Sequence, residues 1–159
     1  MSRGPRPCQG KIAVPLRRTT SILLVEDSPE DYEVTVRAFR KASLANPLYR
    51  CQDGDDALDF LYRRGPYTEA PRPGLILLDL NLPGTDGRQV LTQVKADAQL
   101  RTIPVVVLTT SADERDIEGC YRAGANSYIQ KPVGLEAFLE SIRILKDYWF
   151  EAVLLPRPA

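Results

Sequence analysis

Five short apolar runs alternate along the chain with stretches in which apolar residues recur at helical spacing. The runs cover residues 21–25, 48–52, 75–78, 104–108 and 127–129. The run at 75–78 is apolar on both faces, as a central parallel strand should be. Five strand–helix units in succession predict right-handed crossovers. The pattern therefore predicts an α/β fold with a doubly wound parallel sheet.

The helices are predicted from their start and stop signals. Ser28 followed by Pro29 is a typical helix start, and this helix is expected to run to about Ala42. Further helices are expected after Gly54, after the turn that ends at Gly87, from 112 to 122 and from about 134, with Gly124 closing the fourth helix. Segment 64–74 contains three Pro and two Gly, which predicts an irregular surface loop.

Length and cysteine content limit the class of protein. The 159 residues suit one domain with a single core. No apolar run approaches the roughly 20 residues that span a bilayer, and the N-terminus has no signal-peptide core. Cys8, Cys51 and Cys120 are odd in number and accompanied by no His, which argues against disulfides and against zinc. We expect a cytoplasmic protein without membrane contact.

The net charge of zero hides an uneven distribution. Residues 1–20 carry five cationic side chains and no acid, so the rest of the chain carries a charge of −5. We expect a disordered basic leader here, and no direct DNA binding, because five charges without an aromatic partner give only weak contact with nucleic acid. The chain has no His. Any phosphohistidine in its chemistry must therefore belong to a partner.

Polar residues of a particular kind follow four of the strands: Glu26 with Asp27, Asp79, Thr109 and Lys131. The carboxyl ends of parallel strands meet in one crevice, so these side chains should lie together. Three carboxylates there would repel by roughly 4 kcal/mol per pair at about 4 Å and a dielectric of about 20. They need a hard cation, and Mg²⁺ is the natural one. A hydroxyl and an ammonium beside it suit an incoming phosphoryl group.

These motifs also carry a resemblance. Val25-Glu-Asp27, Leu77-Leu-Asp-Leu-Asn-Leu-Pro-Gly84, Leu108-Thr109, Gly124-Ala125 and Lys131-Pro132 occur in this order. Over about residues 21–148 the chain resembles the receiver domain of two-component response regulators. The resemblance implies a flavodoxin-like receiver fold with strand order 2-1-3-4-5. It also implies a signalling protein that catalyses only its own phosphorylation and dephosphorylation.

The resemblance implies a role for each site residue. Asp79 is the phosphoacceptor for the phosphohistidine of a partner histidine kinase. Mg²⁺ is held by Glu26, Asp27 and Asp79 and by the backbone carbonyl of Asn81.

Three further roles follow from the same resemblance. Lys131 pairs with Asp79 and then with the phosphoryl oxygens, and Thr109 bonds the phosphoryl group. Tyr128 is the switch aromatic that follows Thr109, so the surface of the fourth helix, fifth strand and last helix changes. The Lys131–Pro132 bond is usually cis in such domains, an option that proline allows.

The end of the chain, 149–159, is predicted to be an apolar extension. Its apolar side chains, with the residue before it, exceed what one sheet face needs: Tyr148, Trp149, Phe150, Val153, Leu154 and Leu155. Such surface marks an interface; the alternative is a tail folded back on its own domain. This ending and the 64–74 loop resemble the stand-alone receivers paired with bacterial phytochrome histidine kinases. Members of that group tend to form homodimers through the last helices and the extension.

Two readings of function remain after this. The first is a single-domain response regulator, since the receiver leaves little chain for an output domain. The second is a dimeric adaptor that docks on the kinase without phosphorylation, although an adaptor has no use for three clustered carboxylates. An aspartate-based phosphatase is disfavoured, because Asn81 stands where such an enzyme needs a general acid.

Overall fold

A computed structural model describes residues 20–157; residues 1–19, which make up nearly all of the predicted basic leader, and residues 158–159 lie outside the described part. Five strands form one parallel sheet in the order β2-β1-β3-β4-β5, which confirms the predicted fold class and strand order. The strands are β1 (Ile22–Val25), β2 (Leu48–Cys51), β3 (Leu75–Leu78), β4 (Val105–Thr109) and β5 (Ser127–Gln130).

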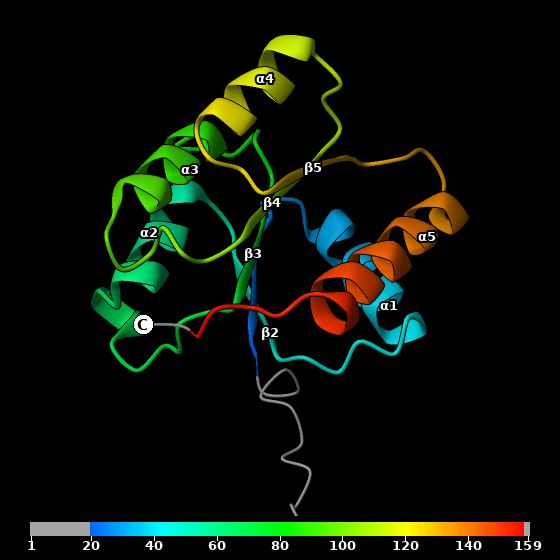
Figure 1. The fold of residues 1–159 in the computed structure, drawn as a ribbon, viewed down its shortest axis with the longest axis horizontal. Coiled ribbons are helices and arrows are strands. Elements are labelled where there is room, and N and C mark those ends of the chain that lie inside the picture. The colour runs from blue at the N-terminus through cyan, green and yellow to red at the C-terminus, as the bar shows by residue number, and fades with distance from the viewer. Residues whose placement is uncertain (1–19, 158–159) are drawn as a thin grey trace, which may run out of the picture.

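Helices cover both faces of this sheet. They are α1 (Pro29–Lys41), α2 (Gly54–Tyr62), α3 (Gly87–Ala96), α4 (Glu114–Arg122) and α5 (Leu135–Lys146), and α5 runs on into the π-helical turn η3 (Asp147–Ala152). Figure 1 shows α1 and α5 on one side of the sheet and α2, α3 and α4 on the other. The first four helices each start at a side-chain cap: Ser28, Asp53, Asp86 and Asp113.

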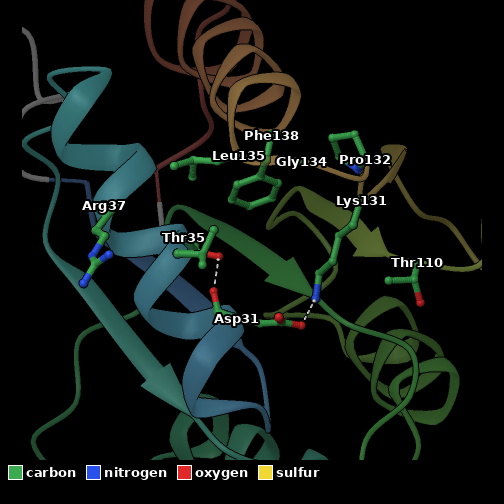
Figure 2. A pocket seen from close by; sticks show the side chains of 10 residues that line it. Asp31, Thr35, Arg37, Thr110, Lys131, Pro132, Gly134, Leu135 and Phe138 are labelled. Atoms are coloured by element: carbon green, nitrogen blue, oxygen red, sulfur yellow. Dashed lines mark hydrogen bonds and ion pairs between the residues drawn. The ribbon is translucent and has the colours of Figure 1, made fainter.

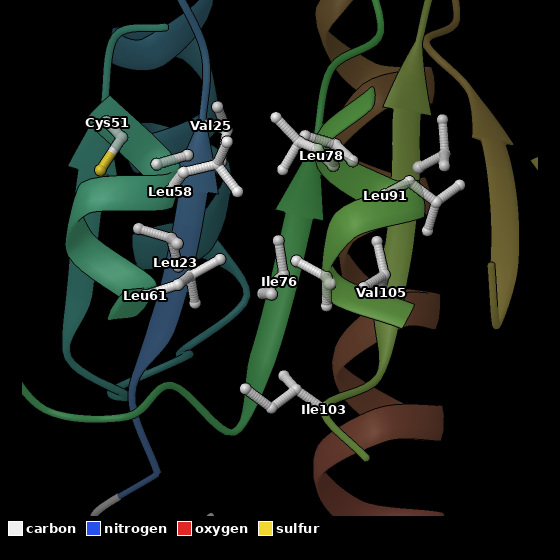
Figure 3. Packing of buried hydrophobic residues seen from close by; sticks show 14 of the residues in the cluster. Leu23, Val25, Cys51, Leu58, Leu61, Ile76, Leu78, Leu91, Ile103 and Val105 are labelled. Carbon is white, nitrogen blue, oxygen red and sulfur yellow. The ribbon is translucent and has the colours of Figure 1, made fainter. Parts of the chain in front are cut away.

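The strands bury both of their faces because successive side chains point to opposite sides. Leu23 and Val25 pack into the cluster under α2 and α3, which Figure 3 shows, whereas Ile22 and Leu24 pack against α1 and α5. The same alternation holds along β3 and β4. The apolar runs are therefore continuous in sequence because the sheet lies between two cores.

Three local expectations need correction. Segment 64–74 is not wholly irregular, because Gly65–Tyr67 forms the 3-10 turn η2, fixed by a 2.7 Å hydrogen bond from the Tyr67 hydroxyl to Asp56. Helix α4 begins at Glu114 rather than at residue 112, since Asp113 caps it. No peptide bond among the described residues is cis, so the expected cis form at Lys131–Pro132 is wrong.

The apolar C-terminal residues divide between the core and the surface. Phe150 is 7% exposed, and Trp149 and Leu155 pack against the same cluster of α1 and α5 side chains. Tyr148 is 53% exposed and Leu154 is 84% exposed. Part of the extension therefore folds back on its own domain, and part of it forms surface.

Among the described helices, none combines the length and the apolar character that crossing a membrane requires.

Candidate functional site

Strand register brings the predicted site residues together. Val25 pairs with Leu78, and the N–H of Asp79 donates to the Val25 carbonyl at 3.1 Å, so Glu26 and Asp79 lie at the same end of neighbouring strands. On the other side the N–H of Lys131 donates to the Thr109 carbonyl at 2.6 Å. The carboxyl ends of β1, β3, β4 and β5 thus form one site, as the parallel sheet requires.

The three predicted acidic ligands form a cluster. Glu26, Asp27 and Asp79 each offer one oxygen, and these oxygens lie within 4.8 Å of one another. Glu26 is buried, and its Oε2 atom has no hydrogen-bond partner within the described part of the chain. A buried carboxylate oxygen left unpaired beside two further carboxylates fits a hard divalent cation with oxygen ligands.

The Lys131 ammonium lies among the carboxylates of the site. Its Nζ atom is 2.9 Å from Glu26 Oε1, 3.2 Å from Asp79 Oδ2 and 3.3 Å from Asp31 Oδ2. The Lys131 and Asp79 side chains are 12% and 13% exposed, so little solvent screens the pair. Asp31, in the first turn of α1, was not among the residues predicted from sequence; its only signal was an acidic first helical turn directly after Asp27.

Burial and mutual charge shift the proton affinities of the site. Burial raises the pKa of the Glu26 carboxyl to about 8; the Asp79 carboxylate adds to this rise and the Lys131 ammonium opposes it. Burial acts against ionisation of Asp79 too, but the neighbouring Glu26 carboxyl and the Lys131 ammonium hold the Asp79 pKa below its ordinary value. Glu26 is therefore the weaker acid of this coupled pair and Asp79 the stronger.

The same carboxylates act on Lys131. Desolvation favours loss of its proton, yet Glu26 and Asp79 outweigh this and raise the Lys131 pKa to about 12. Lys131 is thus a fixed cation at every physiological pH, held against the carboxylate of Asp79.

The other predicted residues are Asn81 after β3, Thr109 at the end of β4 and Tyr128 on β5. The N–H of Asn81 donates to Asp79 Oδ1 at 3.3 Å. Thr109 is fully buried, and its Oγ1 has no hydrogen-bond partner among residues 20–157. The Tyr128 hydroxyl donates to the Ser111 carbonyl at 2.9 Å, so Tyr128 lies against the loop between β4 and α4.

Arg50 on β2 is a second residue that the sequence did not reveal. Its Nε donates to the Glu26 carbonyl at 3.1 Å and its Nη2 to the Asp27 carbonyl at 3.3 Å, with the guanidinium 4.7 Å from the centre of the Tyr32 ring. Arg50 therefore holds the main chain that carries the two acids. An Arg in a weakly apolar strand gives no sequence signal for such a contact.

A cavity of about 360 Å³ opens beside Lys131, between α1 and α5 (Figure 2). Asp31 and Lys131 belong both to this cavity and to the acidic site. The remaining wall is mainly apolar and includes Val34, Leu135 and Phe138. The acidic site thus has an apolar surface next to it.

Comparison with known proteins identifies a family that has this sequence pattern of strands, acids and lysine. The response regulator receiver domain family matches residues 22–143. Response regulator Rcp1 of Synechocystis sp. is 42% identical over 135 residues, which are 85% of this chain and 92% of that protein.

Two solved structures are similar over 87% of this chain and 99% of their own. The Mn²⁺-bound form of response regulator Rcp1 has a TM-score of 0.82 and 40% identity. The phosphorylated cyanobacterial phytochrome response regulator RcpA has a TM-score of 0.83 and 38% identity. Receivers bind divalent metal, in agreement with the acidic cluster.

The sequence motifs, the 2-1-3-4-5 sheet and the convergence of acid, lysine and hydroxyl at its carboxyl edge all have their counterpart in one family. The chain belongs to the response regulator receiver family, and within it is related to phytochrome response regulators.

Proposed function

We propose that this receiver accepts a phosphoryl group on Asp79 from the phosphohistidine of a partner histidine kinase. Phosphorylation of an aspartate by a kinase is general for the family. The observation that supports Asp79 is its carboxylate, lowered in pKa and held 3.2 Å from the Lys131 ammonium at the edge of the acidic cluster. Glu26 and Asp79 both contact the lysine, and of these two Asp79 is the one whose pKa is lowered, which favours the carboxylate form that a nucleophile needs.

The transfer is a displacement at phosphorus. An oxygen of the Asp79 carboxylate attacks, the bond from phosphorus to the histidine nitrogen breaks, and the nitrogen leaves with the electron pair. The Asn81 N–H fixes one carboxylate oxygen and Lys131 the other before the donor arrives. Mg²⁺, held by Glu26, Asp27 and Asp79 and by the Asn81 carbonyl, would supply neutralisation of the charge on the phosphoryl oxygens.

Lys131 and Thr109 then act on the product. The Lys131 ammonium, released from its carboxylate, pairs with a phosphoryl oxygen, and the buried Thr109 hydroxyl donates to another. Tyr128 follows the loop, and the surface of α4, β5 and α5 changes between two arrangements.

The proposed kinase is a bacteriophytochrome, because a similar protein is a phytochrome response regulator. It would dock over the cavity beside Lys131, where Val34 and Leu135 are 37% and 47% exposed. An apolar surface next to the phosphoacceptor can hold a kinase helix while its histidine reaches Asp79.

We also propose a cytoplasmic homodimer that binds no DNA, formed through α5 and the extension. Ile144 is 60% exposed, Tyr148 53% and Leu154 84%, and exposed aliphatic and aromatic surface of this kind marks an interface. Phe150, Trp149 and Leu155 support it from inside, with Val153 half-buried between. Equal dimer affinities with and without a phosphoryl mimic would separate dimerisation from the switch.

Intact-mass measurement after incubation with Mg²⁺ and acetyl phosphate tests the phosphoacceptor. One added phosphoryl group is expected, absent in Asp79→Asn and in the presence of a chelator. Asp31→Asn is the matched control: Asp31 contacts the same lysine, so the variant should still gain the group. An unmodified wild-type protein whose Asp79→Asn variant still functions with the kinase would favour the phosphorylation-independent adaptor instead.

A further inference from the structure

A chain of polar side chains joins α3 to α4 on the surface beside the site. Arg88 donates from Nε and Nη2 to Asp116 Oδ1, at 2.9 and 2.7 Å, and from Nη1 to both oxygens of Asp86 at 3.1 Å. The Ser111 hydroxyl donates to the other oxygen of Asp116 at 2.7 Å. We call Asp86, Arg88, Asp116 and Ser111 the α3–α4 bridge.

The two ends of the bridge lie in the two loops that carry the phosphoryl chemistry. Asp86 caps α3 and closes the segment that begins at Asp79. Ser111 lies two residues after Thr109, and its carbonyl accepts the Tyr128 hydroxyl. The loop from β4 to α4 is thus held from one side by Asp116 and from the other by Tyr128.

The restraint on the β4–α4 loop accounts for the burial of the unpaired Thr109 hydroxyl. Its hydroxyl is buried without a hydrogen-bond partner within the described part of the chain, and an unpaired buried hydroxyl is costly. A loop free to move would let the hydroxyl reach water. Something must therefore hold this backbone: the Lys131 N–H holds the Thr109 carbonyl, and beyond Thr109 the hydrogen bonds at Ser111 hold the loop.

We propose that Arg88 and Asp116 are positioning residues: through Ser111 they hold the β4–α4 loop so that the Thr109 hydroxyl is ready for a phosphoryl group on Asp79. This inference rests on the proposed function of Asp79. Arg88 and Asp116 do not touch the phosphoryl site; they act on it through the loop.

The geometry separates this bridge from an ordinary surface ion pair, which contributes little. Both oxygens of Asp116 are engaged, and the Ser111 hydroxyl and the Arg88 guanidinium hold the pKa of its carboxyl below the ordinary value. By contrast, Arg122 and Glu118 on α4 approach only to 3.9 Å, with side chains 84% and 69% exposed. Arg122→Met therefore removes an arginine from α4, the helix that carries Asp116, without removing a contact to the loop.

The test measures the affinity of the protein for beryllofluoride, a phosphoryl mimic, by ¹⁹F NMR in the presence of saturating Mg²⁺. Arg88→Met and Asp116→Asn should each weaken this affinity about tenfold, within the range that members of one hydrogen-bond network show. The double variant should be no weaker than the weaker single variant. Arg88→Lys, which keeps the charge and one donor, should recover part of the loss, and Arg122→Met should match wild type.

Two further readouts separate positioning from general support of the fold. Mg²⁺ affinity by calorimetry should stay within about twofold of wild type in every bridge variant, because the proposed metal ligands directly follow β1 and β3 and none of them contacts Arg88, Asp116 or Ser111 in a hydrogen bond given above. Amide hydrogen exchange at residues 110–113 should accelerate in the ligand-free bridge variants and in Ser111→Ala.

Each contrary result has a definite meaning. Unchanged beryllofluoride affinity in both single variants, unchanged exchange in the loop, or an equal loss of Mg²⁺ affinity would each overturn the positioning role. If wild-type protein itself fails to bind beryllofluoride with Mg²⁺, the proposed function of Asp79 fails and the inference fails with it. That failure is visible before any bridge variant is measured.

Discussion

Gly87 is the position where α3 begins directly against the backbone of Asp79, the proposed phosphoacceptor. A Cβ atom added there would lie 2.7 Å from Leu80 Cα and 3.0 Å from the carbonyl carbon of Asp79, and closer still to the Asp79 carbonyl oxygen. Ordinary contacts begin at 3.4 Å, so the shortfall at Leu80 Cα is 3.4 − 2.7 = 0.7 Å. All three atoms are backbone, and no side-chain rotation can relieve the clash.

Gly87→Ala should therefore destabilise the domain and displace the site. Overpacking costs about 1–3 kcal/mol, whereas an alanine in a helix gains about 0.5–1 kcal/mol over glycine. The balance is a loss of up to about 2.5 kcal/mol in the free energy of unfolding, or up to about 10 °C in melting temperature. Because the displaced atoms include the Asp79 backbone, the rate of phosphorylation by acetyl phosphate should fall as well.

Gly119 on α4 provides the matched control. A Cβ there meets nothing within 4 Å, so Gly119→Ala should show the helix gain alone, about 0.5–1 kcal/mol. Urea unfolding of the two variants beside wild type should give shifts of opposite sign. A Gly87→Ala protein as stable as wild type, with unchanged phosphorylation, would refute the close approach of α3 to Asp79.

Three other predictions concern single side chains. Lys131→Met leaves the buried carboxylates of the site without their cation. Urea unfolding without metal should therefore show a loss of about 3–5 kcal/mol in the free energy of unfolding, and Mg²⁺ should restore most of it. A free energy of unfolding that does not respond to Mg²⁺ would contradict a metal site there. Burial raises the pKa of the Cys51 thiol to about 12, so at pH 8 native protein should resist alkylation at Cys51 until it unfolds; rapid labelling would contradict this. Tyr67→Phe removes the hydrogen bond to Asp56 and should speed limited proteolysis within 64–74 without changing Mg²⁺ affinity. An unchanged rate of proteolysis would mean that this hydrogen bond does not hold the loop.

The fold was predictable from the spacing of apolar residues along the chain, and the cluster of acids with Lys131 was predictable from the position of these residues directly after the strands. Continuous apolar runs predicted strands buried on two faces, and polar residues at the strand ends predicted one shared site. The role of Arg50 was not predicted because Arg50 contacts backbone carbonyls, which every residue has, so no residue type in the sequence indicates such a contact. Asp31 escaped because its reach to Lys131 depends on how α1 lies on the sheet.

The C-terminal aromatics show why the division between core and surface was not predictable. Leu145 and Phe150 are both buried, five residues apart, whereas a regular α-helix would have continued the buried stripe at Trp149. The π-helical turn η3 has the wider repeat, so it turns Phe150 inward and leaves Tyr148 outside. Counting apolar residues predicted an excess of apolar surface, but only the local helix type decides which members of it are exposed.

The structure also shows unpaired buried polar atoms, which cannot be predicted from the sequence. Four buried side-chain polar atoms in the described part lack a hydrogen-bond partner, and two of them, Glu26 Oε2 and Thr109 Oγ1, belong to the site. Each such atom costs about 1–3 kcal/mol, a cost that the packing of the rest of the domain must offset. A cation would satisfy the first and a phosphoryl oxygen the second. The unpaired atoms thus fit the proposed phosphoryl transfer, which would bring a positive charge beside Glu26 and a negative charge beside Thr109.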